Sequence, residues 1–328
     1  MPVFNPTQLD SGGINPKNIV WIFGTARVGS TWLSAMMADL KGHQRWEEPL
    51  VGELFGHYFY YRGLRWNDWN APWHRNDGGN FIFSPSHKKT WLSSIRSFVL
   101  DGARARFTEI SKLNYLIIQE PNGSIGAPWL MEALPESRMV FLIRDPRDIV
   151  ASLVDAYRKG SWAYEEEYEY LIDHKSNQQH GAPDSPADNI PDSWVEELVD
   201  NCVLALGNSK QAYDNHRGYK VLVRYEDLRL DTLGTMNHIY TALEIPVNEE
   251  ELARVVDKHA WENIPKDRKG KGKILRKATP GGWREDLAAE QVEIVETKAA
   301  SLIKEFYFEN RASSKQRSWG EYSAEGRE

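Results

Sequence analysis

Short apolar runs alternate with helical patterns along most of the chain. Four runs have the length and residue content of buried parallel strands: Ile19 to Phe23, Tyr115 to Ile118, Met139 to Ile143 and Tyr219 to Val223. Turn residues and then a helical pattern follow each run, as in βαβ units. The pattern predicts an α/β fold, a single domain with a central parallel sheet flanked by helices. Ligands collect at the carboxyl ends of such strands.

Three further segments have the apolar spacing of helices: Asp192 to Asn215, Asp231 to Leu243 and Glu285 to Phe308. Residues 160–193 break the pattern, because the acidic aromatic stretch SWAYEEEYEYLIDH leads into a segment rich in Pro, Gly and Asp. An insertion of this kind beside strand ends is typical of a lid or a binding loop. We therefore predict an N-terminal extension over 1–18, one domain over 19–309 with an acceptor-side insertion at 160–193, and a polar, disordered tail over 310–328.

Composition narrows the class of protein. The chain has 328 residues, 41% of them hydrophobic, which is enough for one large core, and its net charge of −7 argues against nucleic acid as a partner. Cys202 is the single cysteine, so no internal disulfide or thiolate metal cluster is expected, and a reducing, cytoplasmic location is favoured. We find no apolar stretch typical of a signal peptide or a membrane anchor.

The first predicted strand runs into a loop that contains two glycines, in the sequence WIFGTARVGSTWL from Trp21 to Leu33. A glycine loop that opens a helix can cradle an anion, because backbone N–H groups and the helix dipole converge there. The spacing of Gly24 and Gly29 nearly satisfies the nucleotide motif G-x-x-x-x-G-K-[ST], but the lysine is missing. Arg27 lies inside the loop and could grip an anion instead. The same glycines also fit an ordinary strand-to-helix turn.

A second strand end carries RDPRD, Arg144 to Asp148. Asp145 is the expected N-cap, Pro146 the first helical residue and Asp148 an acidic residue of the first turn, so capping accounts for all three. Arg144 is expected to face the ligand cleft, with Ser152 two helical turns further on. The alternative is a surface arginine paired with a carboxylate.

Several separated segments resemble the sulfotransferases that use 3'-phosphoadenosine 5'-phosphosulfate (PAPS). ARVGSTW, Ala26 to Trp32, resembles their 5'-phosphosulfate loop P-[KR]-S-G-T-T-W, and LIRDPRDIVAS, Leu142 to Ser152, resembles their 3'-phosphate motif. RKATPGGWR, Arg276 to Arg284, is similar to the late motif R-K-G-x-x-G-D-W-K. RYEDL, from Arg224, and KHAWENI, from Lys258, resemble the tyrosine-bearing and adenine-side segments.

This resemblance implies the P-loop-kinase-like sulfotransferase fold. It also implies transfer of a sulfuryl group from PAPS to a hydroxyl or amine of a small molecule by in-line displacement, with release of 3',5'-bisphosphoadenosine (PAP) and no metal. The residues that it assigns to the donor are Arg27, Val28, Gly29, Ser30 and Thr31 for the phosphosulfate, Trp32, Tyr225 and Trp261 for the adenosine side, and Arg144, Ser152, Arg276, Lys277 and Ala278 for the 3'-phosphate.

The general base is where the chain departs from part of the family. Cytosolic relatives carry a histidine in a K-T-H motif after the second strand, whereas this chain has Gln119-Glu120-Pro121-Asn122. Tyrosylprotein sulfotransferases, which also have arginine in the first loop, use a glutamate in a G-E-E-T segment. Counting forward places Glu48 at the position of that catalytic glutamate. The resemblance thus implies two catalytic residues, Glu48 and Arg27. A carboxylate partly buried in a cleft would have a raised pKa, although Glu47 and Glu48 could also be solvated charges.

Alternatives remain at this point. His43, His57, His87 and Glu120 are further candidates for the base. A P-loop nucleotide kinase would need the missing lysine, and a non-catalytic PAP-binding protein would lack Arg27 or the base. The acidic aromatic residues Glu165 to Tyr170 favour a cationic or amphipathic small-molecule acceptor, while lipids, polyketide-bound hydroxyls and glycans stay open. The sequence indicates no oligomeric state.

Overall fold

The computed structural model describes residues 14–56, 87–111, 114–158, 160–163 and 191–308. The chain forms two compact units. The first, here called the sheet unit, comprises residues 1–144 and 204–267, and the second unit comprises residues 145–203 and 268–328.

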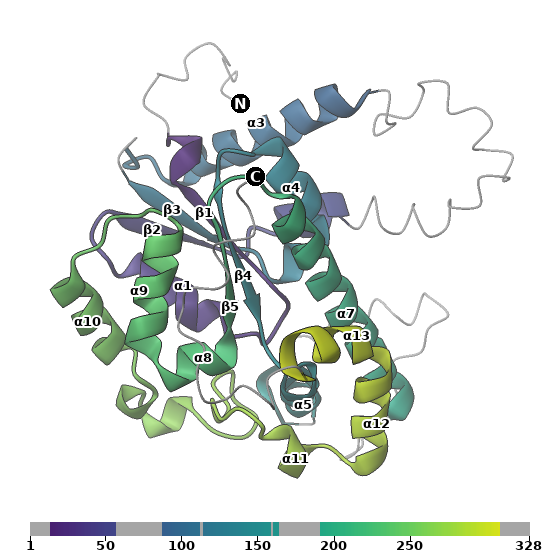
Figure 1. Ribbon diagram of the computed structural model, residues 1–328. Coiled ribbons are helices and arrows are strands. Elements are labelled where there is room, and N and C mark those ends of the chain that lie inside the picture. Colours follow the sequence, from purple (N-terminus) through teal and green to yellow (C-terminus); the bar gives the residue numbers. More distant parts are fainter. Residues whose placement is uncertain (1–13, 57–86, 112–113, 159, 164–190, 309–328) are drawn as a thin grey trace, which may run out of the picture. The chain divides into compact units, whose positions relative to one another are not determined.

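The sheet unit is built on five parallel strands in the order β2-β3-β1-β4-β5 (Figure 1). The strands are β1 Ile19–Phe23, β2 His43–Glu47, β3 Tyr115–Gln119, β4 Arg138–Ile143 and β5 Lys220–Arg224. The predicted α/β class and parallel sheet are confirmed, and each of the four predicted strands lies within one residue of its expected bounds. β2 was not predicted, because this strand at the edge of the sheet is HQRWE and has no apolar run.

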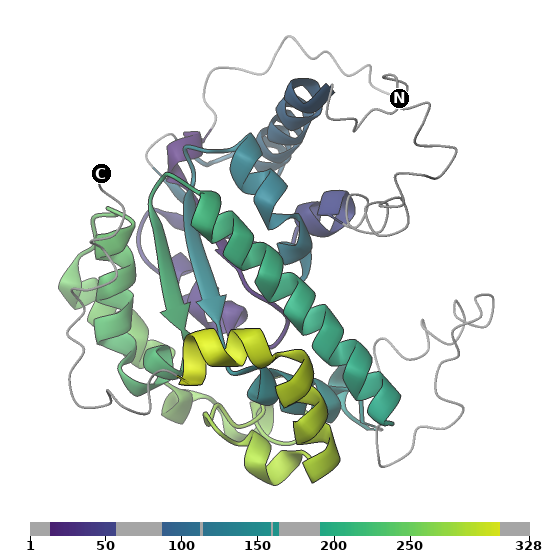
Figure 2. The ribbon, with the colours of Figure 1, turned by 45° about the vertical axis from the view of Figure 1, so that its right-hand side comes forward.

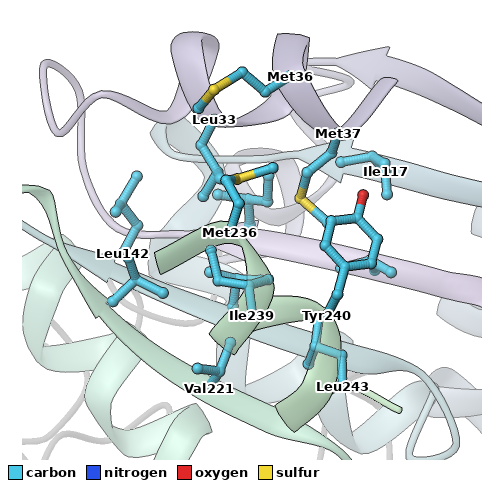
Figure 3. Packing of buried hydrophobic residues seen from close by; sticks show 14 of the residues in the cluster. Leu33, Met36, Met37, Ile117, Leu142, Val221, Met236, Ile239, Tyr240 and Leu243 are labelled. Atoms are coloured by element: carbon cyan, nitrogen blue, oxygen red, sulfur yellow. The ribbon is translucent and has the colours of Figure 1, made fainter. Parts of the chain in front are cut away.

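One face of the sheet packs against α1 Ser30–Ala38 and α9 Thr232–Ala242. Alternate residues of the strands point to this face, as the strand period requires. Figure 3 shows Met37 of α1 beside Tyr240 of α9 over the sheet, and Leu33, Met36 and Ile239 belong to the same buried cluster. α8 Tyr225–Leu230 and α10 Glu249–Lys258 contact α9. The helix expected over Asp231 to Leu243 is confirmed as α9, which Asp231 caps by accepting a hydrogen bond from the Gly234 amide.

The opposite face of the sheet packs against α3 Lys88–Arg106 and the part of α7 that begins at Leu204. A side chain at Gly102 of α3 would meet the indole of Trp46 in β2 at 2.9 Å. Phe141 of β4 lies 6.0 Å from Tyr213 of α7, ring centroid to ring centroid. α3 also contacts α4 Ala127–Ala133, which follows the short 3-10 helix η5 Asn122–Gly126. α7 itself runs from Asp192 to Asn215, as predicted.

The second unit gathers α5 Pro146–Ala156, α11 Trp283–Asp286, α12 Ala289–Lys298 and α13 Ala300–Ile303, followed by the π-turn Lys304–Phe308. α12 lies beside α5 (Figure 2), and Val150, Val154 and Val295 belong to their shared core. Asp145 caps α5 as expected, accepting a hydrogen bond from the Arg147 amide at 2.9 Å. The single helix expected over Glu285 to Phe308 is wrong, because the backbone is extended at Leu287 and Ala288.

Several predicted segments fall outside the described ranges. The N-terminal extension is described only from residue 14, where Pro16–Asn18 forms a 3-10 turn. Residues 164–190 of the predicted insertion and the predicted tail are not described. The boundaries of 19–309 therefore stay a prediction. In the part of the chain that is described, no helix is long and apolar enough to cross a membrane.

Candidate functional site

The loop between β1 and α1 requires glycine at both ends. A side chain at Gly24 would lie 2.5 Å from the carbonyl oxygen of Leu142 in β4. Gly29 has a φ of +97°, and a side chain there would lie 2.6 Å from the ring of Tyr225. Glycine adopts this left-handed conformation without strain, whereas an L side chain does not. The loop is thus held directly against the carboxyl end of β4 and against the first residue of α8.

The amino terminus of α1 opens from this loop without a side-chain cap, since Gly29 occupies the N-cap position. The first amides of an α-helix have no partner within the helix, so an uncapped start can bind an anion. Ser30 is buried and Thr31 is exposed, and the Thr31 hydroxyl accepts a hydrogen bond from Nε2 of Gln119 at 3.1 Å. Val28 is fully buried and fixes the loop in the core.

At the end of β4, Arg144 contacts Arg27 and Tyr225, and all three residues are predicted to bind PAPS. Its Nη1 donates to the carbonyl oxygen of Arg27 at 2.9 Å, and its guanidinium carbon lies 4.5 Å from the centroid of the Tyr225 ring. Its Nε is buried with no hydrogen-bond partner in the described part of the chain. No ion pair to Arg144 is found there either, which disfavours a surface arginine neutralised by a carboxylate. A cation held against an aromatic face beside Arg27 is suited to bind an anionic group.

The predicted adenosine-side residues lie in the same unit. The Trp32 indole N–H donates to the carbonyl oxygen of His259 at 2.9 Å, and the guanidinium carbon of Arg229 lies 5.3 Å from the centroid of the Trp32 ring system. The rings of Trp32 and Tyr225 form a T-shaped pair, with centroids 6.4 Å apart. Trp261 begins the 3-10 turn Trp261–Asn263 and is half-buried. Trp32 is therefore a fixed, half-buried aromatic surface next to the glycine loop.

Glu48 follows β2 directly and is held on both carboxylate oxygens. Oε1 accepts a hydrogen bond from Nε2 of Gln119 at 3.2 Å, and Oε2 accepts one from Nδ2 of Asn122. Burial raises the pKa of Glu48, the hydrogen bonds from Asn122 and Gln119 lower it, and the charges of Glu47 and Glu53 raise it further, with a net upward shift. The picture of two solvated charges is wrong for Glu48. It is right for Glu47, which is exposed and pairs with Arg45 at 2.8 Å.

Gln119 connects these groups and was not predicted as a site residue. The same Nε2 atom donates to the Thr31 hydroxyl at the start of α1 and to the Glu48 carboxylate, while Oε1 accepts from the Ser34 hydroxyl at 2.6 Å. The sequence shows Gln119 as a polar residue directly after an apolar run. That pattern could have placed Gln119 at the carboxyl ends of the strands, but it could not have identified the partners of its side chain.

The other candidates for the base are placed differently. Glu120 is fully buried, and its two oxygens accept hydrogen bonds from the backbone amides of Leu50 and Gly52. Burial raises the pKa of Glu120 to about 7 against the lowering effect of these amides. His43 begins β2, at the opposite edge of the sheet from the strand carboxyl ends, and stacks on Tyr115. His87 flanks α3, and His57 lies outside the described residues.

The second unit contains the remaining residues that are predicted to bind PAPS. Arg276 donates to the carbonyl oxygen of Ala151 in α5 at 2.8 Å and forms an ion pair with Asp286. Lys277 pairs with the same carboxylate at 2.9 Å. Ala278 has a φ of +48°, and Ser152 is buried in α5.

Asp148 requires a correction, because capping of α5 does not account for it. The residue is 2% exposed, and its oxygens accept hydrogen bonds from the amide of Gly281 at 2.6 Å and from the amide of Trp283 at 3.0 Å. A buried carboxylate that binds two backbone amides fixes their loop. Asp148 therefore holds the segment that follows Arg276 to Ala278 against α5. An acidic residue in a first helical turn looks the same in the sequence whether or not it has such a partner.

Within the described ranges, no group of three or more His, Cys, Asp or Glu side chains could hold a metal ion.

Comparison with protein families finds the sulfotransferase domain over residues 17–306. Among solved structures, mouse sulfotransferase SULT7A1 complexed with PAP is similar, with a TM-score of 0.51, 12% identity and 90% of each chain covered. STF9 from Mycobacterium avium matches with a TM-score of 0.49 and 12% identity over 89% of this chain and 78% of that chain. A search of curated proteins finds no match. At this identity, the similarity to the SULT7A1 structure shows a shared fold.

The close approach at Gly29 gives a direct test of the loop. Gly29→Ala should lower the free energy of unfolding by about 1–3 kcal/mol, because it adds left-handed strain and a clash with Tyr225. Gly207→Ala is the matched control: among the described residues, no atom outside the adjoining backbone of α7 lies within 4 Å of the added methyl, so helix propensity should make it neutral or stabilising. Urea denaturation of the two variants measures this, and equal stabilities would contradict the described packing.

Proposed function

Because the chain belongs to the sulfotransferase family, we propose that it transfers a sulfuryl group from PAPS to a hydroxyl or amine of a small-molecule acceptor and releases PAP. Membership of the family confirms the predicted enzyme class, fold class and sulfuryl donor. It removes the P-loop kinase alternative, which also lacked its lysine. The observation that supports the proposed site best is that contacts around the β1–α1 loop lead to both arginines and to Glu48: Arg144 binds the carbonyl oxygen of Arg27, and Gln119 joins Thr31, at the uncapped start of α1, to Glu48.

We assign the 5'-phosphosulfate to the β1–α1 loop. The amides of Gly29, Ser30 and Thr31 and the hydroxyls of Ser30 and Thr31 would donate to its oxygens, since the start of α1 has no side-chain cap. The amide of Val28, the fourth residue assigned by the resemblance, donates to the carbonyl oxygen of Thr25 at 3.3 Å. Arg27 would offset the negative charge that grows on the bridging oxygen as the S–O bond to the 5'-phosphate breaks. The left-handed backbone of Arg27, with a φ of +66°, fixes where its side chain leaves the loop.

The 3'-phosphate distinguishes PAPS from ordinary adenylates, and we assign it to Arg144 of the sheet unit; the role of Ser152 and of the segment Arg276 to Ala278, in the second unit, stays a prediction from the resemblance. The buried Nε of Arg144, for which the described residues supply no acceptor, supports this role, because a buried donor without an acceptor is unfavourable. Trp32, Tyr225 and Trp261 are assigned to the adenosine. Trp32 offers an aromatic face next to the loop, held by His259 and Arg229.

We propose Glu48 as the general base. Its carboxylate would take the proton of the acceptor while the acceptor oxygen or nitrogen forms its bond to sulfur and the bond from sulfur to the bridging oxygen breaks. The raised pKa of Glu48 makes it a stronger base than an exposed glutamate. Its link through Gln119 to the start of α1 supports this role, because it ties the base to the loop assigned to the donor.

Isothermal titration tests the donor site. PAP should bind at least about 100-fold more tightly than adenosine 5'-monophosphate or ATP, because only PAP offers a 3'-phosphate to charged donors. Arg144→Met should weaken PAP by about 10–100-fold and adenosine 5'-monophosphate by a smaller factor, since only PAP also loses its contact to the 3'-phosphate, whereas Arg45→Met, which removes an arginine paired with Glu47, should change neither. Equal affinity for PAP and ATP would contradict the assignment of the 3'-phosphate.

We further propose that the acceptor is cationic or amphipathic, on the basis of the acidic aromatic stretch Glu165 to Tyr170, which lies outside the described residues. A radiolabelled PAPS screen over amines, phenols, long-chain alcohols and sugars should label cationic or amphipathic acceptors preferentially. Replacing Glu165, Glu166 and Glu167 by lysine should raise the KM of a cationic acceptor about tenfold, equivalent to the loss of a few weak charge contacts. Glu249→Lys/Glu250→Lys, at exposed positions of α10, is the control. An unchanged KM would rule the idea out.

A cytoplasmic location stays a prediction.

Glu48→Gln tests the base. This variant should lower kcat by about 10²–10⁴-fold and leave PAP affinity unchanged, since it removes the proton acceptor at constant size. In the wild type, kcat should fall as the pH drops through the raised pKa of Glu48. The midpoint of this fall in the pH profile of kcat should therefore lie above the pKa of about 4.3 that is typical of glutamate. Glu47→Gln, next in the chain but exposed and paired with Arg45, should keep full kcat. A Glu48→Gln enzyme within twofold of wild-type kcat would exclude this base.

A further inference from the structure

A fully buried carboxylate lies close to the proposed base. Glu120 is 0% exposed, and its two oxygens accept hydrogen bonds from the amides of Leu50 at 3.1 Å and Gly52 at 2.9 Å. No ion pair with Glu120 is found among the described residues, and the charged groups that act on it, Glu48 and Glu53, are both acidic. Burying a carboxylate charge is unfavourable unless its hydrogen bonds offset the lost hydration, so the bonds to these two amides are important for the local fold.

The two amides belong to a strained turn that carries Glu48. The φ of Glu48 is +41° and that of Leu50 is +57°, values that non-glycine residues adopt at an energetic penalty of about 1–3 kcal/mol each. The turn is fastened at its start, where the Glu48 amide donates to the carbonyl oxygen of Gln119 at 2.9 Å. At its end, a helical segment begins at residue 51, and the Glu120 carboxylate supplies acceptors for its first amides.

Glycines bring the same turn against the segment after β3. A side chain at Gly52 would lie 2.0 Å from the carbonyl oxygen of Gly123, and one at Gly126 would lie 2.3 Å from the carbonyl oxygen of Gly52. A side chain at Gly123 would lie 1.9 Å from Oε1 of Glu120. Asn122, at the start of this segment, is the residue that donates to Oε2 of Glu48. Glu120 thus fastens together the two backbone segments that determine where Glu48 lies.

We propose that Glu120 is a positioning residue for the sulfuryl-transfer reaction: by binding the amides of Leu50 and Gly52 it fixes the turn that places the Glu48 carboxylate. The proposal rests on the proposed role of Glu48 as the base. A glutamine at residue 120 has nearly the same size, but its NH2 group would face one of the two amide N–H groups and lose that hydrogen bond. The strained turn would then be free to relax, and Glu48 would leave its position.

The test compares Glu120→Gln with Glu132→Gln. Glu120→Gln should lower kcat by about 10–100-fold, since a base displaced by about 1 Å loses rate on that scale, and should leave PAP affinity within twofold of wild type. Glu132 is the control, because its carboxylate pairs with Lys88 and its side chain is 44% exposed, so Glu132→Gln should leave both values unchanged. An unchanged kcat in a folded Glu120→Gln enzyme would overturn the proposal.

A double variant separates positioning from a merely structural role. If Glu120 acts through Glu48, adding Glu120→Gln to Glu48→Gln should lower kcat no further, whereas independent effects multiply. Multiplying losses would overturn the proposal and leave Glu48 as the base. If Glu48→Gln alone keeps its kcat, the proposed base and this proposal are both excluded. Should Glu120→Gln not fold, Glu120→Asp keeps the buried charge but is too short to reach both amides, and the same two readouts decide with it.

Discussion

The close approach of the β1–α1 loop to the end of β4 and to Tyr225 is the constraint on which the proposed PAPS site depends. A single methyl group at Gly24 or Gly29 would meet a backbone oxygen or an aromatic ring at less than van der Waals distance. Because Gly24 and Gly29 have no side chains, the loop can lie close enough for the carbonyl oxygen of Arg27 to accept a hydrogen bond from Arg144. The Arg144 guanidinium in turn lies over the Tyr225 ring. Two cationic residues from distant parts of the chain are thereby held beside the start of α1.

Gln119 extends this arrangement to the opposite side of the site. As the last residue of β3, it lies at the same edge of the sheet as the glycine loop, since β3 pairs with β1 in parallel. One amide group therefore reaches both Thr31 and Glu48, and its oxygen is fixed by Ser34. Parallel pairing is what turns residues far apart in the sequence into neighbours, with Glu48 itself following the adjacent strand β2.

Elements whose signal is local could be predicted from the sequence. Buried strands consist of apolar runs, and a glycine loop before a helix is visible in a few residues, so the sheet core and the β1–α1 loop were found. β2 was missed because an edge strand with the sequence HQRWE does not show the apolar pattern. The partners of Asp148 and Glu120 could not be predicted for another reason: a carboxylate has the same letter whether it caps its own helix, faces solvent or binds amides far along the chain. Such partners are set by the tertiary fold.

The groups around Glu48 also explain why its pKa is raised when hydrogen bonds to a carboxylate normally lower it. Its donors are the side-chain amides of Gln119 and Asn122, which are neutral, so they orient the carboxylate with only a partial stabilisation of its charge. An arginine in their place would favour the ionised form much more strongly and would weaken the base. Burial and the acidic neighbours Glu47 and Glu53 act in the opposite direction and dominate. A carboxylate fixed by neutral donors is thus both well oriented and basic, which is the combination that proton removal from an acceptor requires.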